Sequence, residues 1–175
     1  MSDASKPAKK DGADSDASVR RIKAPIKLDY TVTAGLALSR FLKGVTAGKL
    51  LGQRCGVCNK VYVPPRGGCP TCGVGMGEQV EVKDTGTLTT FCIVNVPFEG
   101  QTMKLPYVYG CIALDGADNA LHHLILAPPE EVRMGMRLRA EWVPPESRPA
   151  SMEAIRWFVP TGEPDAPWDS YKEHL

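Results

Sequence analysis

Four cysteines constrain this chain more than any other feature of its sequence. They form two Cys-x2-Cys pairs separated by ten residues, and they are Cys55, Cys58, Cys69 and Cys72. Two-residue spacing lets both thiolates of a pair face one metal ion, and a Gly or Asn after the second cysteine can adopt the left-handed backbone that closes such a loop. Four sulfurs complete a tetrahedral site and leave no position for water or a substrate. The array therefore predicts a structural metal centre and no reaction at the metal.

The start of the chain and its apolar runs indicate where these thiols reside. Met1 is followed by polar residues rather than a signal peptide, and no apolar run is long enough to span a membrane. We expect a cytoplasmic protein without membrane association, in which paired cysteines bind a metal rather than form disulfides. Four thiolates accept zinc or iron, and we favour one zinc ion because no redox partner is indicated. Cys92 and Cys111 lie outside the array, in strand-like segments where we expect small buried side chains.

The net charge and the aromatic content of the chain argue against binding of nucleic acid or of an anionic membrane. The 175 residues carry a formal net charge of +1, and aromatic residues make up 7%. A near-neutral chain has no global field that attracts nucleic acid or an anionic membrane, and single-stranded nucleic acid requires exposed aromatics between basic residues. Arginines cluster near residues 133–139, where alternation places Arg137 and Arg139 on one face of a strand. A solvated barrel exterior is favoured for that face over a site for CoA phosphates or nucleic acid.

Residues 1–48 divide into a tail and a helical segment. Residues 1–28 are rich in Ser, Ala, Asp, Lys and Gly, and they are too poor in apolar residues to offset the entropy of ordering. We therefore expect a disordered tail. Within residues 29–48 we predict a helix over residues 33–48, with Thr33 as its cap and Gly48 at its end. Its apolar face has helical spacing and consists of Leu38, Phe41, Leu42 and Val45.

The rest of the chain shows β patterns. Residues 49–82 are predicted to form the metal-binding ribbon, and residues 83–160 a barrel with strands at residues 86–96, 107–114, 120–127, 137–143 and 152–159. The turn residues at 115–119 would join the second and third strands as a hairpin. This pattern suggests a five-stranded OB-fold, with a six-stranded Greek-key barrel as the alternative. The chain is thus expected to be mainly β, with a tail at residues 161–175.

The residue patterns indicate no catalytic group. His122 and His123 are neighbours in a predicted strand, so they should point to opposite faces, and neither has an identifiable partner acid or nucleophile. Asp115 and Asp118 are explained by turn formation. We therefore predict no catalytic residue and leave the substrate-binding residues unassigned.

The order of helix, ribbon and barrel resembles a known family, the "domain of unknown function 35", whose members join an N-terminal helix, a rubredoxin-like zinc ribbon and an OB-fold. The resemblance covers roughly residues 28–160. It rests on the ribbon cysteines and on five further runs: residues 35–42 (Gly-Leu-Ala-Leu-Ser-Arg-Phe-Leu), 48–55 (Gly-Lys-Leu-Leu-Gly-Gln-Arg-Cys), 62–66 (Tyr-Val-Pro-Pro-Arg), 84–88 (Asp-Thr-Gly-Thr-Leu) and 114–118 (Leu-Asp-Gly-Ala-Asp). The Gly135-Met136 step before the last two strands also fits.

The resemblance implies a function that the residues alone do not show. Family members work with thiolase-superfamily proteins on acyl-CoA thioesters, and this chain looks most like the accessory subunits of thiolase-like aldolases in steroid degradation. It implies a non-catalytic subunit of an aldolase (lyase) or acyltransferase complex. The partner would perform retro-aldol cleavage of a steroid side-chain β-hydroxyacyl-CoA, with the acyl-CoA near the shared interface of a hetero-oligomer. The alternative is an OB-fold protein that binds single-stranded nucleic acid.

Three large side chains are candidates for contact with such a partner. Phe41 lies on the apolar face of the predicted helix, which would cover either its own domain or a partner. Trp168 and Tyr171 are large aromatics in an otherwise polar tail. We therefore predict that these three side chains face a partner protein.

Overall fold

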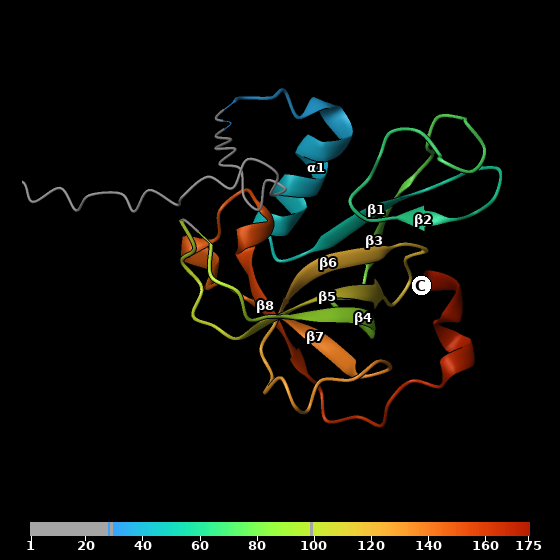
Figure 1. Cartoon of the computed structure of the whole chain (residues 1–175). Coiled ribbons are helices and arrows are strands. Elements are labelled where there is room, and N and C mark those ends of the chain that lie inside the picture. Colours follow the sequence, from blue (N-terminus) through green and yellow to red (C-terminus); the bar gives the residue numbers. More distant parts are fainter. Residues whose placement is uncertain (1–27, 29, 99) are drawn as a thin grey trace, which may run out of the picture. The chain divides into compact units, whose positions relative to one another are not determined.

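The computed structural model describes residues 28, 30–98 and 100–175, and its contacts separate Met1–Val32 from a unit formed by Thr33–Leu175 (Figure 1). The predicted disordered tail lies outside the described residues, apart from Leu28. In the part of the chain that the structure describes, no helix has the length and apolar character needed to cross a membrane.

One α-helix, α1 (Gly35–Thr46), precedes the ribbon and packs on strand β1 (Leu50–Arg54) and on the short 3-10 helix η2 (Met152–Ala154). Phe41 and Val45 are fully buried, and the other two residues of the predicted apolar face are half-buried against the same core. The apolar face of the helix is therefore confirmed.

The two ends of α1 differ in how well the sequence predicts them. Gly48 terminates the helix as predicted, because it adopts a φ of 76° and its N–H donates to the carbonyl of Val45 at 3.0 Å. The start differs from the prediction, because Ala34 occupies the N-cap position and makes no side-chain capping bond. Thr33 lies one residue too early to cap the helix.

The ribbon is a three-stranded antiparallel sheet in which β1 lies between β2 (Val61–Tyr62) and β3 (Gln79–Val82). Two long loops, one from β1 to β2 and one from β2 to β3, each carry one Cys-x2-Cys pair. The sheet therefore brings together two loops that are separated in the sequence (Figure 1).

A closed five-stranded barrel follows the ribbon, with strand order β4-β5-β6-β8-β7. Its strands are β4 (Thr85–Val94), β5 (Tyr107–Leu114), β6 (Ala120–Ile125), β7 (Arg137–Trp142) and β8 (Ile155–Pro160). β4 pairs with β5 on one side and β7 on the other, and β6 meets β8 in a parallel contact through the single pair Ile125–Phe158. This arrangement confirms the five-stranded OB-fold and excludes the six-stranded alternative.

The last strand begins later than predicted. Residues Met152–Ala154 form η2 rather than strand, because the Ser151 hydroxyl accepts the N–H of Glu153 at 3.3 Å and stabilises a tight turn. Strand β8 starts only at Ile155. The predicted hairpin of β5 and β6 is confirmed, with Cys111 opposite His122.

One apolar core runs through the helix, the ribbon and the barrel. Leu88, Ile112 and Phe158 fill the barrel interior, and the same cluster includes Val45 from α1 and Val63, which follows β2. Because these side chains share one buried cluster, the ribbon does not depend on the metal site alone for its position.

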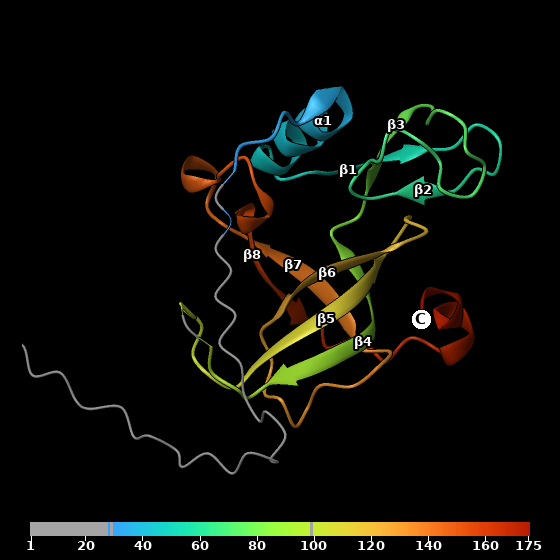
Figure 2. The same ribbon diagram turned by 45° about the horizontal axis from the view of Figure 1, so that its top comes forward.

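The segment after β8 returns along the barrel and packs against it (Figure 2). The N–H of Ala166 donates to the carbonyl of Gly135 at 2.8 Å, and Arg133 forms a two-bond ion pair with Asp165 at 2.6 and 2.8 Å. Tyr171 is only 6% exposed. Residues 161–175 are therefore an ordered covering of the barrel.

Candidate functional site

The ribbon brings the four cysteine sulfurs into one cluster, in which all Sγ atoms lie within 4.8 Å of one another. Cys55 and Cys69 are fully buried, whereas Cys58 and Cys72 are half-buried. Metal–sulfur bonds of about 2.3 Å in a tetrahedron would place the sulfurs about 3.8 Å apart. The Sγ atoms of Cys58 and Cys69 are 3.7 Å apart. The donor set and its spacing therefore fit a single metal ion.

The backbone of both cysteine loops closes in the way the sequence predicts. Asn59 and Gly73, which follow the second cysteine of each pair, adopt φ values of 61° and 69°. Each N–H donates to the carbonyl of the first cysteine of its pair, at 3.0 and 2.9 Å. This left-handed step turns both thiols of a pair toward the same point.

The pKa values of Cys55 and Cys72 are shifted in opposite directions. Backbone N–H groups of Cys58 and Val57 lower the pKa of Cys55 to about 6. Hydrogen bonding with Cys58, followed by burial, raises the pKa of Cys72 to about 12. Because the thiolate is the form that binds a metal, the backbone of the first loop prepares Cys55 as a ligand.

The surroundings of the cluster support a structural role. Tyr62 packs against the buried cysteines together with Met76, and the Tyr62 hydroxyl lies 3.1 Å from the hydroxyl of Thr71. The guanidinium of Arg66 covers the Tyr62 ring at 5.8 Å. Four thiolate ligands fill a tetrahedral site, so a bound metal would hold the two loops together without an open position for a substrate.

The turn between β5 and β6 joins the barrel to the ribbon. The Asp118 carboxylate accepts the N–H of Val61 at 2.7 Å, and the Asp118 N–H donates to the Val61 carbonyl at 2.7 Å. Asn119 repeats this pattern through its side-chain amide, which bonds both backbone groups of Val63. The sequence predicted only a turn for these residues, and their contact with the ribbon is a finding of the structure.

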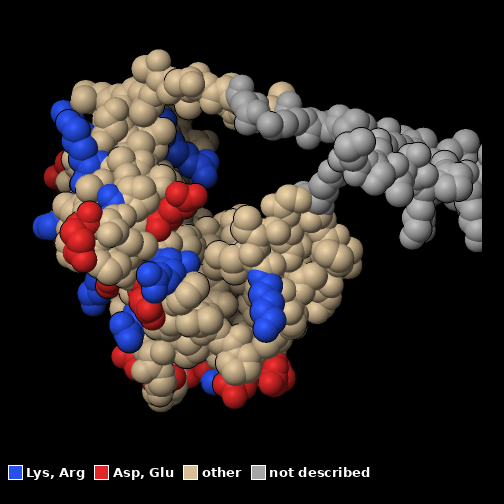
Figure 3. Space-filling view, turned by 90° about the vertical axis from the view of Figure 1, so that its left-hand side faces the viewer, with Lys and Arg blue, Asp and Glu red and all other residues tan. Residues whose placement is uncertain are grey.

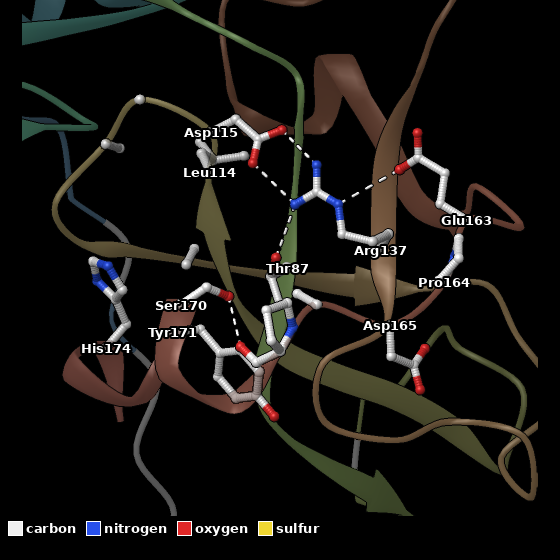
Figure 4. Close-up of a pocket in the computed structure, with 15 residues that line it drawn as sticks. Thr87, Leu114, Asp115, Arg137, Glu163, Pro164, Asp165, Ser170, Tyr171 and His174 are labelled. Carbon is white, nitrogen blue, oxygen red and sulfur yellow. Dashed lines mark hydrogen bonds and ion pairs between the residues drawn. The ribbon is translucent and has the colours of Figure 1, made fainter.

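A second polar cluster lies on the barrel, beside a cavity of about 690 Å³ that the C-terminal segment covers (Figure 4). Arg137 donates through both terminal nitrogens to Asp115, at 2.9 and 2.6 Å, and to the Thr87 hydroxyl at 2.8 Å. Its Nε lies 3.5 Å from the carboxylate of Glu163. The Arg137 guanidinium therefore forms its hydrogen bonds and ion pairs within the chain, and its contact with Glu163 helps to hold the C-terminal segment on the barrel.

The environment of Asp115 changes its acidity. Arg137 holds the pKa of the Asp115 carboxyl below its usual value, and the Thr85 hydroxyl adds to this effect. The pKa of Arg137 is raised for the same reason. Turn formation alone, as predicted from the sequence, does not account for Asp115, because its carboxylate links β5 to β7.

Two further arginines near the barrel, Arg148 and Arg139, differ in their contacts. Arg148 donates to the carbonyl of Val143 at 2.7 Å and covers the Trp142 ring, whereas Arg139 is exposed as the strand alternation predicts. On the side of the molecule drawn in Figure 3, basic side chains are scattered among acidic and uncharged ones. No continuous basic track is visible on that side. Of the two arginines predicted to share a solvated face, Arg139 is exposed, but the Arg137 side chain is only 19% exposed because the C-terminal segment covers it. The prediction of a solvated exterior is therefore wrong for Arg137.

The two neighbouring histidines lie on opposite faces of β6, as predicted. His122 is exposed, and its ring lies 6.4 Å from that of Tyr109. His123 is 9% exposed, packs against Phe158 inside the barrel, and has a pKa lowered by burial. Neither ring approaches the cysteine cluster or the Arg137 cluster among the contacts of the described residues.

Two predicted partner contacts are wrong. Phe41 is 1% exposed because the helix packs on the core of its own chain, and Tyr171 is 6% exposed because the C-terminal segment packs on the barrel. Trp168 is 53% exposed and stays a candidate for partner contact. The expectation for Cys92 is also wrong, because it lies on the outer face of β4 opposite the exposed Tyr109.

Two family models match consecutive parts of the chain. One, described as "ChsH2, rubredoxin-like zinc ribbon domain", matches residues 42–76. The other, described as "ChsH2, C-terminal OB-fold domain", matches residues 79–143. Together the two matches take in more than half of the chain.

Curated relatives are similar to about half of the chain. The chain is 30% identical over 92 residues to a DUF35 domain-containing scaffold protein of Methanocaldococcus jannaschii, a match that spans 52% of this chain and 65% of the relative. It is 26% identical over 95 residues to a probable enoyl-CoA hydratase alpha subunit of Thermomonospora curvata, over 54% of this chain and 30% of the relative. The chain thus spans less than two thirds of either relative.

Two solved structures share the fold of this chain. The "Ltp2-ChsH2(DUF35) aldolase" structure matches with a TM-score of 0.54 and 23% identity, over 70% of this chain and 92% of the other. A DUF35-family protein of unknown function from Sulfolobus solfataricus matches with a TM-score of 0.52 and 24% identity, over 61% and 78%. From its ribbon, its five-stranded barrel and the two matching family models, we conclude that the chain belongs to the ChsH2 (DUF35) family of zinc-ribbon OB-fold proteins.

Proposed function

We propose that this chain is an accessory subunit that docks on a thiolase-superfamily enzyme and supports its action on acyl-CoA thioesters. The observation that carries the proposal is the ribbon joined to an OB-fold, an architecture shared with the structure named an Ltp2-ChsH2(DUF35) aldolase. The relatives named as a scaffold protein and as an enoyl-CoA hydratase subunit favour the same class of role.

The contacts of the candidate reactive groups favour a supporting role. The cysteine cluster suits a closed metal site, Arg137 is held by Asp115 and Thr87, and His123 is buried inside the barrel. A nucleophile or general base must reach the substrate, and these groups instead stabilise the fold. We therefore assign the chemical step to the partner enzyme.

The proposed metal is one structural zinc ion, held by Cys55, Cys58, Cys69 and Cys72. Its support is the set of four sulfurs and the match to a rubredoxin-like zinc ribbon model. Iron is the competing metal, because four thiolates accept both. Metal analysis with visible absorption spectroscopy separates them, since a ferric tetrathiolate absorbs strongly and zinc does not.

The proposed reaction of the complex is retro-aldol cleavage of a steroid side-chain β-hydroxyacyl-CoA. This step breaks the bond between the α and β carbons and yields a carbonyl compound and a shorter acyl-CoA. The acyl-CoA would lie near the interface of the two proteins. The name of the aldolase structure supports this reaction class, and the steroid substrate rests on the family resemblance.

Co-expression with a thiolase-like protein encoded nearby tests the proposal. The two proteins should elute together at micromolar concentration, and cleavage of the thioester should require both. Separate elution, or equal cleavage by the thiolase-like protein alone, would contradict the accessory role. Titration with a single-stranded oligonucleotide at low and high salt tests the alternative, because nucleic-acid binding would be tight and salt-dependent.

A further inference from the structure

A buried histidine lies where the barrel closes through the smallest strand pairing. β6 and β8 share the single pair Ile125–Phe158, beside which the Leu126 N–H donates to the Phe158 carbonyl at 2.9 Å. His123 comes just before this contact on β6 and is 9% exposed. Its ring meets the Phe158 ring edge-on at 5.6 Å. The imidazole therefore packs inside the barrel against the residue through which the two strands meet.

The same ring also contacts the segment that leads into β8. Nε2 of His123 lies 3.5 Å from the carbonyl of Met152, which belongs to η2, and β8 begins directly after that 3-10 helix. A carbonyl only accepts hydrogen bonds, so this contact places the proton of the neutral ring on Nε2. A neutral imidazole on β6 thus contacts both β8 and the turn before it.

The other ring nitrogen has no place for a second proton. Nδ1 of His123 is buried and has no hydrogen-bond partner among the described residues. In the neutral ring this atom carries a lone pair, whereas protonation would add an N–H donor and a positive charge there. A buried charge without a partner costs far more free energy than a buried neutral group. The closed barrel therefore opposes protonation of this ring.

The charged and titratable side chains around His123 do not offset that cost. Glu153 on η2, Arg156 on β8 and Tyr109 on β5 line the adjoining cavity, and all three are exposed. His122, the neighbour on β6, points to the outer face. Within the described ranges, none of these four side chains forms a hydrogen bond or ion pair with the His123 ring.

The acidity of His123 differs between the closed and the open barrel. Burial lowers the pKa of His123, and the backbone groups of Met152 and Leu124 raise it only in part. Once the ring reaches water, its pKa returns to the ordinary value of about 6.5. As the pH falls through that value, the open form takes up a proton that the closed form resists. Acid therefore shifts the equilibrium toward the open form.

We propose that the contact between β6 and β8 opens in a proton-coupled step, in which separation of the two strands lets solvent deliver one proton to Nδ1 of His123. Reclosure returns this proton to solvent, so no covalent bond between heavy atoms changes. The ribbon and the eight residue pairs between β4 and β5 stay intact during this step. The step involves neither a partner protein nor a metal, so it is independent of the proposed accessory role.

Amide hydrogen exchange of the full chain, followed by NMR, tests the proposal at the Leu126 N–H. One proton taken up by a ring with an ordinary pKa of about 6.5 predicts that the opening constant, corrected for intrinsic exchange, rises up to about tenfold from about pH 7.5 to about pH 5.5. The reference is the Leu88 N–H, which donates to the Met136 carbonyl at 2.9 Å.

Low urea concentrations separate local opening from global unfolding. Exchange of the Leu126 amide should change less than about twofold, because a local opening exposes little surface, whereas exchange of the Leu88 amide should accelerate. Equal sensitivity of the two amides to urea would show that the barrel opens only by unfolding, and would overturn the proposal.

Two neighbouring variants identify the group that takes up the proton. His123→Gln has a neutral side chain at every pH and keeps a donor for the Met152 carbonyl, so the rise at Leu126 should fall below about twofold. His122→Gln, at the exposed neighbour, should keep the full rise. A rise that persists in His123→Gln, or that disappears in His122→Gln, would contradict the assignment to His123.

The ring signals of the parent chain provide a readout that does not depend on the folding of a variant. In ¹H–¹³C NMR spectra, the His123 ring should titrate below the ordinary histidine pKa of about 6.5. A midpoint at or above that value would show that the closed barrel accepts the proton, and the coupling between protonation and opening would be refuted.

Discussion

The side-chain amide of Asn119 makes two hydrogen bonds with the backbone of Val63. Its Oδ1 accepts the Val63 N–H at 2.8 Å, and its Nδ2 donates to the Val63 carbonyl at 2.7 Å. Asparagine thereby acts as an additional strand residue that extends the edge of the ribbon sheet. Together with Asp118 on Val61, it ties a hairpin turn of the barrel to the strand between the two cysteine loops.

Replacement of Asn119 by Ala should destabilise the chain by about 1–3 kcal/mol, because two half-buried backbone groups would lose their partners. Urea unfolding measures the effect. The matched control is Asn95→Ala, since the Asn95 side chain makes one exposed hydrogen bond to the nearby carbonyl of Ile93. Equal stability of the Asn119 variant and the parent would show that the contact with Val63 contributes nothing.

Cys55→Ser should abolish stoichiometric metal binding and lower the free energy of unfolding by several kcal/mol, because metal affinity supplies folding energy to ribbons of this kind. Elemental analysis should find about one metal ion per parent chain and much less in the variant. Cys92→Ser, at an exposed cysteine on β4, is the control and should keep both metal and stability. A metal-free variant that melts like the parent would refute a structural ribbon.

The ion pair between Asp115 and Arg137 should make stability depend on pH. The pKa of Asp115 is lowered in the folded state, so its stabilisation is present above the ordinary aspartate pKa of about 3.9 and is lost as the pH falls below it. Asp115→Asn should cost about 1–2 kcal/mol at pH 7, since hydrogen bonds to charged groups exceed exposed ion pairs in strength.

Urea unfolding at pH steps from 7 to about 3 tests this pH dependence. The difference between parent and Asp115→Asn should shrink toward the acid end. Asp169→Asn serves as the control, because Asp169 makes an exposed ion pair with Lys172 that should contribute at most about 1 kcal/mol. A constant difference across the whole range would exclude titration of Asp115 as the cause.

Phe41→Ala should destabilise the isolated chain by about 3–5 kcal/mol, because it removes a fully buried ring from the shared core. Thermal or urea unfolding of the chain without any partner measures this loss. Leu36→Ala on the same helix, at a side chain that is 69% exposed, should stay within about 0.5 kcal/mol of the parent. Similar losses in the two variants would disagree with the burial of Phe41.

Trp168→Ala should weaken binding to a thiolase-like partner while it leaves most of the chain's own stability intact. Its ring is 53% exposed and has an edge-on contact with Tyr171 at 5.5 Å, which is worth at most about 1.5 kcal/mol. A central aromatic at an interface contributes about 2 kcal/mol or more, so affinity should fall roughly 30-fold. Tyr171→Ala is the contrasting variant, since it should mainly lower stability.

The elements with strong periodicity could be predicted from the sequence. The apolar face of α1 follows helical spacing, and the left-handed steps at Asn59 and Gly73 follow from their place after the second cysteines. The five strands of the barrel were predicted because each contains a run of strand-forming residues between turn residues. Local chemistry determines all of these features.

Features that depend on long-range contact could not be predicted in this way. The role of Asn119 depends on Val63, which lies 56 residues away, and the role of Asp115 depends on Arg137 across the barrel. Phe41 and Tyr171 look like free apolar side chains until the surfaces that bury them are known. The single-pair contact between β6 and β8 is likewise a property of the closed barrel and not of either strand.

The unequal pairing around the barrel has a consequence for its fluctuations. β4 and β5 share eight residue pairs, whereas β6 and β8 share one. Local opening requires least free energy where the fewest backbone bonds must break. Amide protons at this seam should therefore exchange with solvent sooner than those between β4 and β5. In its dynamics the barrel then behaves as a curled sheet whose two edges touch, rather than as a uniform ring.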